Sequence, residues 1–86
     1  SAGSIDPMRR DLQRFTVTAL ITQASAPSGA LNEDARAVAS DTLRRLAARF
    51  GTASKSSQVD GMTKTHLSEM RQQIARWEDR RMTSAN

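Results

Sequence analysis

Apolar residues recur at helical spacing in three separate segments, and this pattern restricts the chain to an all-α fold. No segment shows the apolar–polar alternation of a half-buried strand. Three amphipathic helices joined by short loops bury their stripes best against one another, which predicts a three-helix up-down-up bundle. The stripes are Met8, Leu12, Phe15 and Ala19; Ala35, Ala39, Leu43, Leu46 and Phe50; and Leu67, Met70, Ile74 and Trp77.

Capping residues set the expected ends of these helices. Asp6 and Asn32 are suited to cap the first and second helices, because a short polar side chain accepts hydrogen bonds from free backbone N–H groups. Gly51 is expected to end the second helix, and Asp60 or Thr63 to cap the third. The predicted helices cover residues 6–24, 32–50 and 63–82.

The length of 86 residues corresponds to one domain with a small core. We expect that domain to span residues 5–82, with residues 83–86 as a frayed tail. Residues 1–4 are expected to be disordered, and Ser-Ala-Gly at the start resembles a cloning remnant, so a piece of a longer protein is expected. There are no cysteines, no signal-peptide pattern and no apolar run long enough to cross a membrane.

The first helix has two apolar faces, and only one of them fits the bundle. We expect its Leu12–Phe15 face to join the core and its second face to meet a partner, although isolated apolar residues on a surface are the alternative. The predicted core is Leu12, Phe15, Leu43, Leu46, Phe50, Leu67, Met70, Ile74 and Trp77. The candidate interface is Val17, Leu20 and Ile21, with Arg10 and Arg14 close by on the same helix.

No motif in the chain indicates catalysis, a metal or a cofactor. His66 is the only histidine, and without cysteine or a second histidine the usual ligands of a zinc site are missing. Glu69 lies one turn further on, but this pair is better explained by a half-buried histidine that hydrogen-bonds its neighbours. The serines cluster in loops without a Gly-x-Ser-x-Gly turn or a nearby base, and the isolated glycines form no phosphate loop. We therefore predict no catalytic, metal-binding or cofactor-binding residue.

The charge pattern bears on binding to nucleic acid. The net charge is +4, and Arg71, Arg76, Arg80 and Arg81 share the third helix, which could act as a recognition helix. Acidic residues are interleaved with these arginines, and only 3% of the residues are aromatic. The pattern therefore favours a solvated surface over a nucleic-acid interface.

Three blocks resemble the C-terminal region of a family of large bacterial, extracytoplasmic zinc-dependent metalloproteases. The first is Ile5-Asp6-Pro7-Met8-Arg9-Arg10-Asp11-Leu12-Gln13-Arg14-Phe15, which is similar to the family's I-D-x-x-R-R-x-L-Q-R-x-[YF] stretch. Residues 34–46 are similar to its next helix, and Thr63, His66, Leu67, Glu69 and Ile74 to its T-x-x-H-L-x-[DE]-x-x-x-x-I helix. The family's catalytic His-Glu-x-x-His signature is absent, so no catalytic or metal-binding residue carries over. Residues 17–20 depart from the family's pattern.

The resemblance implies a non-catalytic accessory domain that packs against the rest of a larger polypeptide, in the periplasm or outside the cell. The first alternative is a free-standing helical module for protein interaction or dimerisation. A DNA-binding three-helix domain is the second. We expect a protein partner and no membrane contact.

Overall fold

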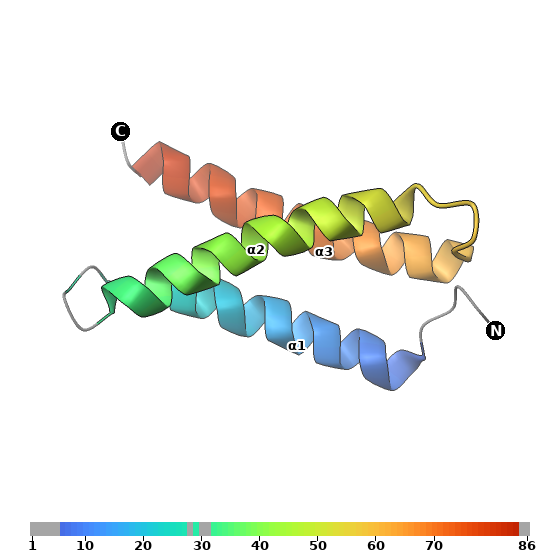
Figure 1. The fold of residues 1–86 in the computed structure, drawn as a ribbon, viewed down its shortest axis with the longest axis horizontal. Coiled ribbons are helices and arrows are strands. Elements are labelled where there is room, and N and C mark those ends of the chain that lie inside the picture. The colour runs from blue at the N-terminus through green and yellow to red at the C-terminus, as the bar shows by residue number, and fades with distance from the viewer. Residues whose placement is uncertain (1–5, 28, 30–31, 85–86) are drawn as a thin grey trace.

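The computed structural model describes residues 6–27, 29 and 32–84 of the chain. Three helices run up, down and up, as Figure 1 shows: α1 covers Pro7–Ala24, α2 Glu33–Ser54 and α3 Gly61–Ser84. The predicted all-α, three-helix architecture is confirmed. Residues 1–4, for which disorder was expected, and the tail residues Ala85 and Asn86 lie outside the described residues. Thr83 and Ser84, which were expected in the frayed tail, belong to α3.

The ends of α1 and α3 follow from their capping residues. Asp6 Oδ1 accepts a hydrogen bond from the N–H of Arg9 at 3.0 Å, and Pro7 occupies the first helical position, where its missing N–H costs nothing. Asp60 Oδ1 accepts from the N–H of Thr63 at 2.8 Å. Asp60 is therefore the cap of α3, and the helix begins at Gly61, two residues before the predicted start.

Both predicted ends of α2 need correction. Asn32 precedes the helix, but its side chain caps no helical N–H group; its Nδ2 instead donates to the carbonyl oxygen of Pro27 at 3.3 Å. Gly51 does not end the helix, which continues to Ser54. Gly51 is buried against α3, where an added Cβ would lie 3.3 Å from Arg71 Cζ. This glycine allows close approach to the Arg71 side chain rather than a left-handed turn.

The core lies along the faces that α2 and α3 turn toward each other and toward the C-terminal half of α1. Leu43, at the middle of α2, has no exposed surface. Of the predicted core, six residues are buried and Leu46 is partly buried. The six are Leu43, Phe50, Leu67, Met70, Ile74 and Trp77. Leu12 and Phe15 are the exceptions.

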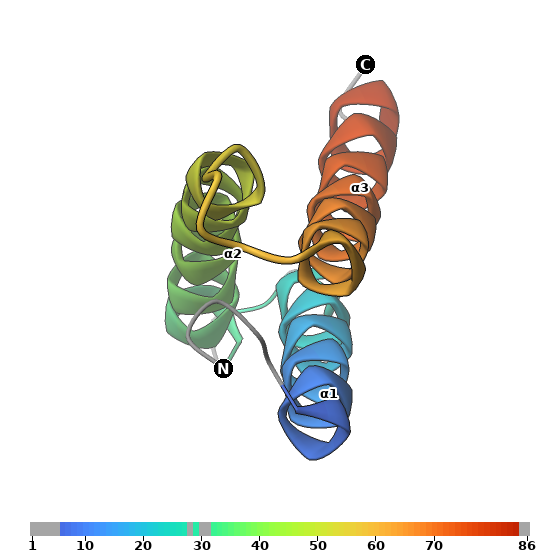
Figure 2. The same ribbon diagram turned by 90° about the vertical axis from the view of Figure 1, so that its right-hand side faces the viewer.

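The bundle is elongated and open rather than round. It measures 46 × 25 × 14 Å, with a radius of gyration of 14.2 Å, whereas a compact domain of this length has a radius of gyration of about 12 Å. Figures 1 and 2 show that α2 lies beside both other helices, while the first turns of α1 and the last turns of α3, at opposite ends of the molecule, each diverge from α2. The outer side of α1 is therefore covered by neither α2 nor α3.

Candidate protein-interaction surface

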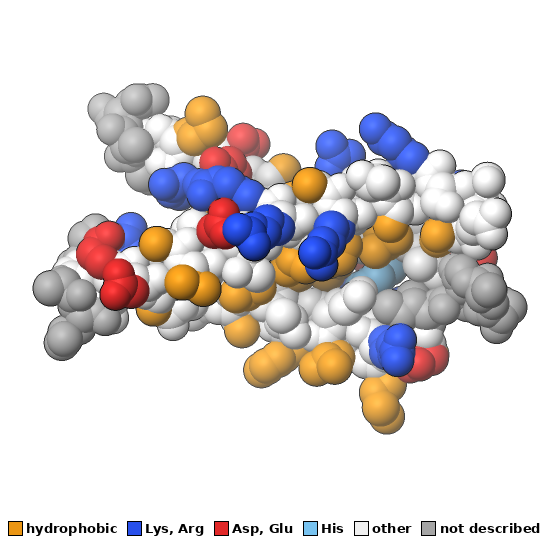
Figure 3. Space-filling view, viewed as in Figure 1, with side chains coloured by type: hydrophobic (Ala, Val, Ile, Leu, Met, Phe, Trp, Pro, Cys, Tyr) orange, Lys and Arg blue, Asp and Glu red, His pale blue; other side chains and the backbone are white. Residues whose placement is uncertain are grey.

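Three large apolar side chains on the outer side of α1 are exposed to solvent. The exposed fractions are 81% for Met8, 63% for Leu12 and 72% for Phe15, and Ala19, one turn further on, is also exposed. Figure 3 shows hydrophobic side chains projecting along the lower edge of the molecule, where α1 runs. We call Met8, Leu12, Phe15 and Ala19 the outer seam.

The structure reverses the two predicted faces of α1. Leu12 and Phe15 were expected in the core and are exposed, whereas Val17, expected at an interface, is only 1% exposed. Leu20 and Ile21 are partly buried and pack against the core cluster. These three residues therefore hold α1 to the bundle and do not form the predicted free interface.

Polar contacts with α3 accompany the burial of the Val17 side of α1. The N-terminal half of α1 contacts α3 through hydrogen bonds rather than apolar packing. Arg14 donates to Glu69 at 3.0 Å, and Gln13 Oε1 accepts from His66 Nε2 at 2.7 Å. Gln73 Nε2 continues the row by donating to the hydroxyl of Thr18 at 3.1 Å. Gln13 and Arg14 lie on the same side of the helix as Val17, which is buried, so the outer seam on the opposite side is left in solvent.

The two arginines of the candidate interface, Arg10 and Arg14, do not border the outer seam. Arg14 pairs with Glu69 of α3 and also lies 4.0 Å from Asp11, and Arg10 is half-buried. One signal in the sequence would have located the inner face of α1. It is the row of polar residues on α3, His66, Glu69 and Gln73, at spacings of three and four, which matches the polar residues Gln13, Arg14 and Thr18 of α1.

His66 is buried between α1 and α3 and has one unused ring nitrogen. Its Nε2–H donates to Gln13 Oε1, and Nδ1 has no hydrogen-bond partner among the described residues. Burial lowers the pKa of His66 below its usual 6.5, and the charges of Arg14 and Arg10 lower it further, while Glu69 and Asp11 oppose them. A neutral histidine at this position joins two helices.

The contact between α2 and α3 includes an aromatic side chain with two cations beside it. Trp77 is buried, and the guanidinium carbons of Arg44 and Arg81 lie 5.6 and 5.9 Å from its ring centroid. These distances are within the range of cation–π attraction. Arg44 and Arg81 also pair with Glu78, at 3.4 and 3.7 Å. Trp77 is thus part of the core, as predicted.

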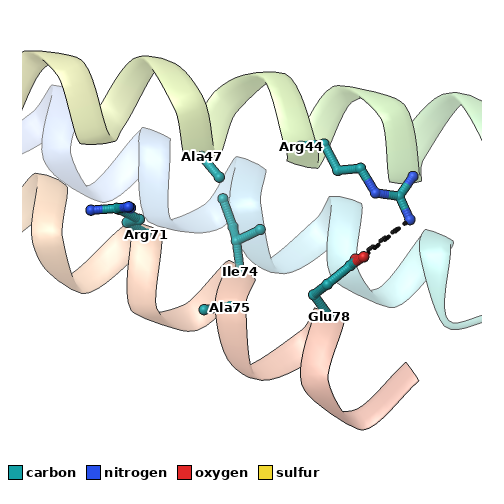
Figure 4. A pocket seen from close by; sticks show the side chains of 6 residues that line it. All are labelled: Arg44, Ala47, Arg71, Ile74, Ala75 and Glu78. Carbon is teal, nitrogen blue, oxygen red and sulfur yellow. Dashed lines mark hydrogen bonds and ion pairs between the residues drawn. The ribbon is translucent and has the colours of Figure 1, made fainter. Parts of the chain in front are cut away.

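A shallow groove lies between α2 and α3 next to this cluster. Its volume is about 260 Å³, and Figure 4 shows the Arg44–Glu78 pair at one end and Arg71 at the other. Ala47, Ile74 and Ala75 also line it. The lining holds no histidine, serine or threonine, and it pairs its one carboxylate with an arginine, so it has no acid–base pair or nucleophile arranged for a reaction.

The described residues offer few other groups that could form a functional site. They contain no group of three His, Asp or Glu side chains placed to hold a metal ion, and no helix among them is both long and apolar enough to span a membrane. On α3, the arginines proposed for nucleic-acid contact differ in surroundings: Arg81 faces Trp77 and Glu78, and Arg71 lies over Gly51. Arg76 and Arg80 are exposed.

Comparisons with known proteins found no relative of this chain. No protein-family model, no curated protein and no solved structure matches the chain.

Proposed function

We propose that this chain is a non-catalytic helical accessory module with a structural role, which docks another protein segment on the outer seam of α1. The observation that carries the proposal is the position of Met8, Leu12 and Phe15. They are spaced four and three residues apart, are each more than half exposed, and lie opposite the face that holds α1 to the bundle. Covering such a line of apolar side chains is favourable by roughly 25 cal/mol for each Å² removed from water.

The resemblance to the C-terminal region of zinc-dependent metalloproteases supports a more specific form of this proposal. In that form, the chain is the terminal module of a larger extracytoplasmic protein, in the periplasm or secreted, and contributes packing rather than catalysis. The block with the clearest resemblance, residues 5–15, contains most of the outer seam. The module would then act by assembling or positioning the protein that carries it.

The experiment is photo-crosslinking in the organism that makes the protein. A benzophenone amino acid replaces Phe15 in one version of the gene and Gln72 in a matched control, because Gln72 is exposed on α3. We expect the position-15 probe to give a discrete crosslinked species and the position-72 probe to give none. Equal crosslinking from both positions, or none from position 15, would refute docking on the outer seam.

A further inference from the structure

We infer that the segment docked on the outer seam is the α1 helix of a second copy of this chain, packed antiparallel to the first. This inference rests on the proposed docking function and names its partner. It depends on the width of the seam, on the sizes of its residues, and on the charges beside it.

The seam has the width of a helix–helix contact. Its residues follow a 4-3-4 spacing, which is the a/d pattern of a coiled coil and forms a narrow line along a helix. Arg9 and Thr16 border it on one side and Asp11 and Thr18 on the other, all four exposed. A narrow apolar line between polar borders fits one partner helix with the same pattern, and α1 itself supplies that pattern.

Side-chain sizes favour the antiparallel orientation. In an antiparallel pair, a positions face d positions of the partner, so Met8 would face Ala19 and Leu12 would face Phe15. Each layer then combines a larger with a smaller side chain, as close packing requires. A parallel pair would place Phe15 against Phe15 and Ala19 against Ala19, which crowds one layer and leaves a gap in the next.

The charges on α1 allow this contact. Arg10 and Arg14 lie on the inner side of α1, so neither is buried by a second copy. In the antiparallel pair, the bordering Arg9 would lie near Thr16 of the other copy, and Asp11 near Thr18. No like charges would meet across the contact, although each chain has a net charge of +4.

The size of the seam predicts a weak dimer. Its exposed side chains offer about 400 Å² per copy, or about 800 Å² in total, which is below the range of stable dimers. Because such small contacts are transient, we expect half-association between about 10 µM and 1 mM. The effective concentration of two copies would rise if each belonged to a larger assembly.

Sedimentation velocity over that concentration range tests the inference. We expect the mean mass to rise from monomer toward dimer, Phe15→Asp to remain monomeric throughout, and the control Gln72→Asp to behave as wild type. Phe15 is mainly exposed, so the variant should fold, and far-UV circular dichroism checks this. A wild-type chain that stays monomeric to 1 mM, or a Phe15→Asp chain that dimerises normally, would overturn the inference.

Cysteine crosslinking tests the orientation. Because the sequence contains no cysteine, only the introduced thiols can form disulfides. Met8→Cys and Ala19→Cys chains are mixed and oxidised. We expect the mixed disulfide to predominate, since these positions face each other only in the antiparallel pair; predominance of the two homodimers would overturn that orientation. If the chain is monomeric but the photoprobe at position 15 crosslinks to a different protein, the outer seam is a docking site, and the inference of self-association is wrong. Absence of both signals refutes both proposals.

Discussion

Replacing Val17 with alanine should destabilise the protein far more than replacing the larger Phe15. Val17 is 1% exposed within the core, while Phe15 is 72% exposed on the outer seam. Val17→Ala removes two buried carbon groups, which corresponds to about 1.6 kcal/mol of transfer free energy, and the cavity raises the total to about 2 kcal/mol. Phe15→Ala loses little burial and gains helix propensity, so we expect a change within about 0.5 kcal/mol.

Urea denaturation followed by circular dichroism measures both values. A domain of this size has a total free energy of unfolding of roughly 4–13 kcal/mol, so a loss of about 2 kcal/mol moves the midpoint clearly. The measurement is made at about 5 µM, below the range expected for self-association. A larger loss for Phe15→Ala than for Val17→Ala would mean that α1 turns its other face inward.

Two further changes test the helix contacts. Stability should fall as pH decreases below 6.5, because the lowered pKa of buried His66 means that the unfolded state binds the proton more readily. His66→Gln should make the free energy of unfolding less dependent on pH, which denaturation series at several pH values measure. An unchanged pH dependence would show that His66 is not the group responsible. Gly51→Ala should raise stability by about 0.5 kcal/mol: alanine favours the helix, and the atoms 3.3 Å away belong to the flexible end of Arg71. A drop in melting temperature would show that the Arg71 side chain cannot move aside.

The helices were predictable because their signals are local. Apolar spacing and the Asp6 and Asp60 caps act within a few residues, and the structure confirms both caps. The end of α2 was predicted wrongly at Gly51, because a glycine at a helix–helix contact has the same sequence signature as one at a helix end. Only the position of Arg71, twenty residues later, distinguishes the two cases.

The face of α1 was predicted wrongly for a different physical reason. Apolar spacing identifies a stripe but does not choose between two stripes on one helix, and the Leu12–Phe15 stripe contains the larger residues. The choice depends on pairs distant in sequence, such as Gln13 with His66 and Arg14 with Glu69. Among these groups only His66 is buried, and a buried polar group must find a partner on the helix that it faces. The Arg14–Glu69 pair is half-exposed and adds little.

Trp77 gives the chain a built-in optical probe of one region only. It is the single tryptophan, and there is no tyrosine, so the intrinsic fluorescence comes from this residue and from two weakly emitting phenylalanines. Its ring lies beside Arg44 of α2 and Arg81 of α3, in the core and away from the outer seam of α1. Emission therefore reports separation of α2 from α3, while circular dichroism reports all three helices. A difference between the two unfolding curves would identify detachment or fraying of α1 as a separate step.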